Sequence, residues 1–157
     1  MKCSEYKKDK RTKNLTLRDI HVGDWVQVWS ETTERYSPPL KIIQICDDGT
    51  IYLVTDDEER CTPWEENIKE IDALPIDGDL LKGFGFDIST ILRDSVYLYQ
   101  NVRYRGRYIG QIIYLESGEC TFYASICGYE CEFIHELVNF WHRNHVDIKP
   151  EWKGIEK

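Results

Sequence analysis

The sequence lacks the features that mark membrane-spanning and secreted chains. No apolar run approaches the roughly 20 residues that a membrane-spanning helix requires. Met1 is followed by lysine and polar residues rather than by the apolar segment of a secretory signal. The six cysteines include no C-x-x-C pair, and a cytosolic chain of 157 residues is expected to keep its thiols reduced. We therefore expect a cytoplasmic protein with no membrane contact and no disulfide framework.

Catalytic and metal-binding motifs are also missing. No serine or cysteine has the sequence context of an activated nucleophile. The spacing of Cys127, Cys131, His142 and His145 departs from that of two-Cys two-His zinc fingers both between the pairs and between the histidines. The acidic run 56–59 lacks the alternating ligands and glycine bend of a calcium loop, so we interpret it as a solvated turn. The sequence thus predicts no metal and no cofactor.

Positive charge is scarce outside the beginning of the chain. Net charge is −8, yet residues 1–20 carry seven Lys or Arg against three acids. Residues 21–76 carry four against thirteen, and the remainder carries nine against twelve. An acidic surface repels nucleic acid, because phosphate neutralisation supplies most non-specific affinity. Residues 1–14 are predicted to be a disordered basic tail, with a basic arm that binds nucleic acid or an acidic surface as the alternative.

Apolar and aromatic residues are plentiful enough for one ordinary domain or two small ones, at 41% and 13% of the chain. The stretch 22–29 organises the first half. In an extended backbone its two faces carry valines and tryptophans respectively: Val22, Val26 and Val28 on one side, and Trp25, Gln27 and Trp29 on the other. Both faces must be covered, so we assign the valines to a barrel interior and the tryptophans to a second module or a partner.

Short strands follow this stretch. Asp47-Asp48-Gly49 separates two aliphatic runs, which predicts a β-hairpin over 40–46 and 50–54. The remaining expected elements are a proline loop at 32–39, a short strand at 60–63, a helical turn at 64–67 and a closing strand at 68–71. Residues 15–72 therefore predict a small twisted β-barrel of the SH3 or Tudor type.

The pattern changes in residues 73–150. Asp77 predicts the N-cap of a short helix that Gly83 or Gly85 ends. Alternating aliphatic and tyrosine residues then predict an antiparallel meander, with strands at 95–102, 108–115 and 121–126.

A helix is expected over 134–146, with a buried stripe and an outward polar stripe. The buried stripe contains Ile134, Leu137, Val138 and Trp141, and the outward stripe contains His135, Asn139 and His142. Residues 151–157 are expected to form a loose tail. The fold class is α+β, with a barrel followed by a meander that packs against this C-terminal helix.

Three segments in this order resemble a family of small proteins from Bacteroides-type gut bacteria and their phages or mobile elements. They are Val-Gly-Asp-Trp-Val at 22–26, Leu-Pro-Ile-Asp-Gly-Asp-Leu-Leu-Lys-Gly-Phe-Gly-Phe at 74–86 and His-Glu-Leu-Val-Asn-Phe-Trp at 135–141. The resemblance covers most of residues 15–146. It implies a shared architecture and a phage or mobile-element origin, and it implies no activity, cofactor or catalytic residue.

Three groups of residues are candidate binding sites. One is the polar stripe of His135, Asn139 and His142, which could also be a plain solvated helix face. Aromatic residues of the barrel lie among many carboxylates, which would suit a cationic ligand, although an uncovered tryptophan pair more often forms an interface between modules. These residues are Trp25, Trp29, Tyr36, Tyr52 and Trp64. Arg103, Arg105 and Arg107 alternate with tyrosines across a turn, which would suit nucleic-acid stacking or form a plain solvated hairpin.

We therefore expect a non-catalytic interaction module that binds a protein partner. A nucleic-acid binder that uses the basic tail and the arginine hairpin is the first alternative. An enzyme with a site assembled from scattered residues is the second.

Overall fold

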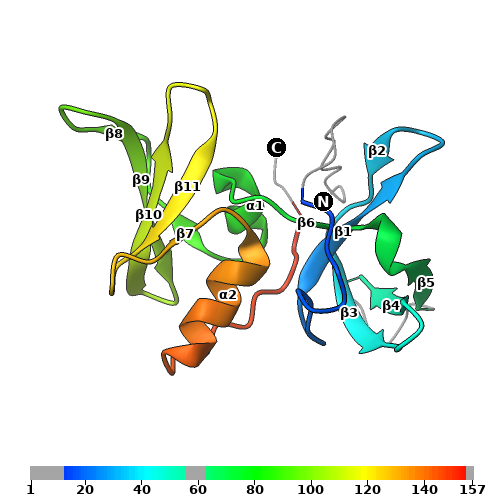
Figure 1. Ribbon diagram of the computed structural model, residues 1–157. Coiled ribbons are helices and arrows are strands. Elements are labelled where there is room, and N and C mark those ends of the chain that lie inside the picture. The colour runs from blue at the N-terminus through cyan, green and yellow to red at the C-terminus, as the bar shows by residue number, and fades with distance from the viewer. Residues whose placement is uncertain (1–12, 56–62, 155–157) are drawn as a thin grey trace. The chain divides into compact units, whose positions relative to one another are not determined.

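A computed structural model describes residues 13–55 and 63–154 (Figure 1). The chain divides into two compact units that meet in the sequence between Leu74 and Pro75, close to the boundary expected after residue 72. Each unit contains its own antiparallel sheet, so the α+β class is confirmed. Most of the basic tail, the acidic run 56–59 and most of the strand expected at 60–63 lie outside the described residues.

The sheet of the N-terminal unit curls into a half-barrel (Figure 1). Its strands are β1 (Trp25–Ser30), β2 (Arg35–Tyr36), β3 (Leu40–Ile45), β4 (Thr50–Val54), β5 (Trp64–Asn67) and β6 (Ile71–Ala73). Strand β1 is central, because it pairs with β2, β3 and β6. The side-chain amide of Gln27 donates to the carbonyl of Ala73 at 3.0 Å, which adds a further tie between β1 and β6.

Both faces of β1 are buried, as the alternation predicted. Val26 and Val28 are buried on one face, and Trp25 and Trp29 are buried on the other. Val22 was wrongly assigned to the valine face, since it is 63% exposed and precedes the strand. A turn separates it from β1: the Asp24 carboxylate accepts the backbone N–H of His21, and Gly23 has φ +98°.

The predicted hairpin is confirmed, with Ile45 opposite Ile51 and Gly49 at φ +93° in its turn. The two elements after it were wrong. Residues 64–67 form strand β5, which pairs with β4, rather than a helical turn. The helical turn comes later, as a 3-10 helix over Ile68–Glu70, because the Asn67 side chain caps it by accepting the N–H of Lys69. The closing strand β6 therefore begins only at Ile71.

The C-terminal unit is a meander covered by two helices. Its elements are α1 (Gly78–Gly83), β7 (Asp87–Ile88), β8 (Leu92–Arg93), β9 (Leu98–Tyr104), β10 (Arg107–Tyr114), β11 (Cys120–Ala124), β12 (Glu130–Cys131) and α2 (Ile134–Arg143). The sheet order β12-β11-β10-β9-β7, with β8 also on β9, confirms the antiparallel meander. The Asp77 carboxylate accepts the N–H groups of Asp79 and Leu80, which confirms the predicted N-cap.

Helix α2 buries a wider stripe than its spacing predicted. Ile134, Leu137 and Trp141 are buried as expected, Val138 is only half-buried, and Phe140 is buried although it was not expected to be. His135 was wrongly placed on the outward face, since it is buried with its ring 6.2 Å from the ring of Phe133. No helix in residues 13–55 and 63–154 has the length and apolar content needed to cross a membrane.

The segment after α2 packs into the C-terminal unit instead of forming a loose tail. Ile148 is fully buried and Trp152 is only 5% exposed. The Trp152 ring lies 4.9 Å from that of Phe84, and the N–H of Lys153 donates to the carbonyl of Gly83 at 2.7 Å. A side chain at Gly83 would overlap the indole, so this glycine makes room for the tryptophan. Ile148 and Trp152 stand alone in a polar segment and form no periodic pattern, so their burial was not predicted from the sequence.

Candidate functional site

The two faces of the C-terminal sheet differ in exposure. Residues opposite one another on neighbouring strands share a face. The row of Val102, Gly110 and Ala124 and the row that includes Ile112 and Phe122 belong to the inner face, which is buried. The row of Asn101, Gln111 and Tyr123 belongs to the opposite face, here called the outer face, together with the pair Arg103 and Tyr108. These side chains are half-buried or exposed, whereas Ile113 and Thr121 in the next row of the outer face are buried, so only part of the outer face is accessible.

Exposed apolar side chains gather on the C-terminal unit. In the described part of the chain, eleven large hydrophobic residues are exposed, and eight of them belong to this unit. They are Ile91, Leu92, Val96, Tyr97, Tyr108, Leu115, Tyr123 and Ile126. Exposed apolar residues are normal when scattered, whereas a concentration of them indicates an interaction surface.

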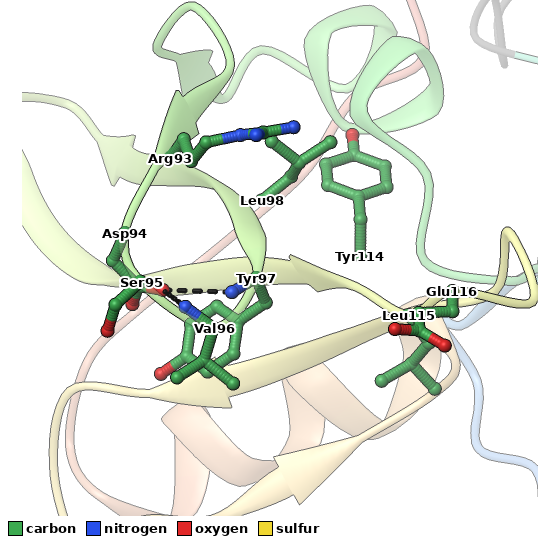
Figure 2. Close-up of a pocket in the computed structure, with 9 residues that line it drawn as sticks. All are labelled: Arg93, Asp94, Ser95, Val96, Tyr97, Leu98, Tyr114, Leu115 and Glu116. Atoms are coloured by element: carbon green, nitrogen blue, oxygen red, sulfur yellow. Dashed lines mark hydrogen bonds between the residues drawn. The ribbon is translucent and has the colours of Figure 1, made fainter.

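A groove of about 310 Å³ lies at one end of this sheet, between the β8–β9 turn and the end of β10 (Figure 2). We call it the turn groove. It is lined by Arg93, Asp94, Ser95, Val96, Tyr97, Leu98, Tyr114, Leu115 and Glu116. Figure 2 shows the Arg93 guanidinium on the same side as Leu98 and the Tyr114 hydroxyl, whereas Tyr97 and Val96 lie at the other side. Most of the lining side chains are exposed, so the groove is open to solvent.

The turn that forms one wall is held by Asp94. Its carboxylate oxygen accepts the backbone N–H of Val96 at 2.7 Å and that of Tyr97 at 2.9 Å. These bonds, with that from Tyr97 the larger cause, lower the pKa of Asp94 and keep it ionised. The turn presents Val96 to solvent, where it is 79% exposed.

The electrostatic surroundings of the groove are negative. The Tyr114 hydroxyl donates to the Gln100 side-chain oxygen, and burial raises the pKa of Tyr114 to about 12. The nearby Cys120, Asp77 and Asp79 add to this shift, because negative charges disfavour the phenolate. Within the described residues, neither Arg93 nor Glu116 makes an ion pair. Both charged groups are therefore available to a ligand.

The aromatic residues expected to bind a cation do not form one accessible surface. Trp25, Trp29 and Tyr36 are buried, and the rings of the last two meet edge to face at 4.9 Å. The Tyr36 hydroxyl donates to the buried Asp72 carboxylate at 2.6 Å. Tyr52 is half-buried opposite Glu65, whose charge raises the Tyr52 pKa. Only Trp64 is exposed among the five.

The arginine hairpin is accessible but engages its own tyrosines. Arg103, Arg105 and Arg107 are all exposed at the β9–β10 turn. The Arg103 guanidinium lies 5.5 Å from the centre of the Tyr108 ring, and that of Arg105 lies 5.3 Å from the Tyr104 ring. These cation–π contacts cover ring faces on which a base would stack.

The polar stripe predicted on α2 is divided. His135 is buried, Asn139 is half-buried and His142 is exposed, with the His142 Nε2 atom 2.7 Å from the carbonyl of Ile148. Cys127 is exposed, whereas Cys131 is buried and burial raises its pKa. In the described part of the chain, no three His, Cys, Asp or Glu side chains are placed to hold a metal ion.

The turn groove was not found from the sequence. The sequence offers two signals for it. Asp94 is followed two residues later by Val96, and Leu115 and Glu116 come directly after β10. An aspartate at the first position of a turn is common, so this pattern has low specificity.

Comparisons with known proteins identify no family. The class of this protein is therefore defined by its fold alone, which is α+β with two antiparallel sheets. No protein-family model matches the chain. No curated protein and no solved structure matches it either.

Proposed function

We propose that this chain is a non-catalytic interaction module that binds a protein partner through its C-terminal unit. The observation that supports the proposal is that eight of the eleven exposed large hydrophobic side chains of the described residues belong to the C-terminal unit. The Tyr123 side chain hydrogen-bonds Glu130, which raises the Tyr123 pKa, and the nearby Tyr97 adds a smaller contribution in the same direction. Tyrosines with a polar end and an apolar ring are enriched at protein interfaces. The contact surface proposed here is the outer face together with the turn groove.

The N-terminal unit then acts as a scaffold, and we infer that it is an SH3-like or Tudor-like barrel. Two features support the finer assignment. Strand β1 is flanked by both β3 and β6, and a short 3-10 helix separates β5 from the last strand. Its tryptophans are buried in the core, which leaves them unsuited to an open ligand cage.

The resemblance to the Bacteroides-type family extends the proposal to a phage or mobile-element gene whose product acts in the cytoplasm. The genes on either side of this one test that part. Phage structural or integration genes within the same transcription unit would support it, and a chromosomal operon for metabolism would contradict it.

Charge favours a protein over a nucleic acid as the partner. The net charge of −8 repels phosphate, and the ring faces at the arginine hairpin are already covered by guanidinium groups. The exposure of Arg103, Arg105 and Arg107 nevertheless keeps nucleic-acid binding as the second candidate. Salt-sensitive retention of labelled oligonucleotides, lost when the three arginines are replaced by alanine, would favour that candidate.

The test of protein binding is cross-linked affinity purification of the full chain from its host. We compare the wild type with the double variant Tyr97→Ser and Tyr123→Ser. The matched control is Trp64→Ser, which removes an exposed aromatic ring from the other unit. The proposal predicts one defined partner that the double variant loses and the control retains.

Two results would contradict the proposal. Equal loss of the partner in the control variant would show that the contact does not depend on the outer face. Retention of the partner by the double variant would show the same. Far-ultraviolet circular dichroism of each variant ensures that unfolding is not mistaken for lost binding.

A further inference from the structure

We propose that the turn groove takes a lysine or arginine side chain of the protein partner. This inference rests on the proposed function and names the chemistry of the contact. The basic head lies at the Glu116 carboxylate, and the aliphatic stem lies on Val96, Tyr97 and Leu115. The groove is described wholly by residues of the C-terminal unit.

The walls of the groove suit the stem of a basic side chain. Val96, Tyr97 and Leu115 are all exposed and line the same groove. Lysine and arginine cover apolar surface with their methylene groups while the charged head stays in contact with water or a counter-charge. A groove that is open to solvent fits such a side chain better than it fits a fully apolar one, because the head need not be desolvated.

The charges around the groove favour a cation. Asp94 and Glu116 line it against the single guanidinium of Arg93. Asp77 and Asp79 lie near enough to Tyr114 to raise its pKa, so they add negative potential at the same end of the sheet. Two backbone N–H groups donate to Oδ1 of Asp94, which fixes this carboxylate in the turn, whereas the Glu116 side chain is exposed and makes no ion pair among the described residues. The net charge of −8 also attracts basic partners at long range.

Arg93 has a separate role on the other side of the groove. Its guanidinium makes no ion pair in the described part of the chain and offers several N–H donors beside Leu98 and Tyr114. In the proposed complex it donates to backbone carbonyl oxygens of the partner.

The test uses small probes on the ¹⁵N-labelled full chain, observed by amide chemical-shift changes. The probes are N-acetyl-lysine methylamide, the matching norleucine compound, which has the stem without the charge, and the matching glutamate compound. We expect the lysine probe to shift the amides of residues 95–97 and 115–116. Glu116→Gln should weaken this binding about threefold, as expected for an exposed ion pair. Glu119→Gln, which removes the same charge from an exposed position outside the groove, should leave it unchanged.

The other outcomes contradict the inference. Equal shifts from norleucine would show an apolar site without charge selection. Stronger shifts from the glutamate probe would assign the groove to carboxylates bound by Arg93. No localised shift from any probe, or equal weakening by Glu119→Gln, would remove the groove as a specific site. If a defined partner is still lost on replacement of Tyr97 and Tyr123, the protein-binding function stands and only the basic contact fails.

Discussion

The two units of this protein differ in how many large hydrophobic side chains they leave exposed. In the N-terminal unit, Trp25, Trp29 and Tyr36 lie in the core, and only three large hydrophobic residues of its described part are exposed. In the C-terminal unit, Tyr97, Tyr123 and six other large hydrophobic residues remain exposed. Aromatic content alone therefore does not locate a binding surface. What distinguishes the two units is whether a strand is covered on both faces or on one.

Replacing Gly110 with alanine should have the largest effect on the C-terminal unit. Gly110 has φ +155°, and a methyl group there would overlap the backbone oxygen of Tyr123 on the neighbouring strand. We expect a loss of about 4 kcal/mol in the free energy of unfolding, measured by urea denaturation. Gly118→Ala is the control, since Gly118 also has positive φ but faces open space. If both variants lose the same free energy of unfolding, the close packing of β10 on β11 does not determine the stability of this sheet.

Replacing Trp152 with alanine should cost about 3 kcal/mol, because it removes a buried ring and leaves a cavity. Amide hydrogen exchange should become faster in α1, which lies beside the vacated space, and at the amide of Phe86, which donates to the Leu81 carbonyl of α1. Unchanged exchange there would show that the last segment is not part of the C-terminal core. The segment after α2 would then be a separate tail rather than part of the C-terminal unit.

Replacing Tyr36 with phenylalanine should cost about 2 kcal/mol, since a buried carboxylate loses a donor. The measurement is thermal unfolding followed by tryptophan fluorescence, to which the neighbouring Trp29 contributes with four other tryptophans. Tyr52→Phe is the matched control, because Tyr52 is only half-buried on the same sheet. Equal effects would mean that burial of the tyrosines in the N-terminal unit has no energetic consequence.

High pH should give the smallest effect, and it should come from the C-terminal unit. The Tyr114 pKa is about 12 in the folded state and near 10 when unfolded, so the unfolded state releases the proton first. This contribution to stability is fully present below pH 10 and is lost as the pH rises towards 12. Because Tyr114 is partly exposed, we expect less than about 1 kcal/mol. Comparison with Tyr114→Phe isolates it, and an identical pH profile in that variant would assign the loss to other groups.

The parts of the fold that depend on local chemistry were predicted from the sequence. Gly49 marked the hairpin, Asp77 marked the start of α1, and alternation marked the meander. The error at residues 64–67 came where strand pairing overrode local propensity. Residues 64–67 pair with β4 as a strand because partners exist for them in space, and propensity alone cannot show such partners.

The candidate site was harder to predict. The groove depends on bringing the turn at 93–97 beside Leu115 and Glu116, which are distant in sequence and meet only through the pairing of β9 with β10. His135 shows the same limit on α2, since its position in the helical spacing did not indicate that its side chain is buried. Spacing along one element identifies a face and does not reveal what lies against it.

The pairing of β1 also has a consequence for the order in which the chain folds. Val26 pairs with Ala73 across a long stretch of sequence, whereas Tyr104 pairs with Arg107 across a tight turn. Contacts between distant residues form slowly, because the loop between them must first close. During synthesis, the earlier half of the chain must therefore wait for its last strand to emerge from the ribosome. The later half can assemble one hairpin at a time as it appears.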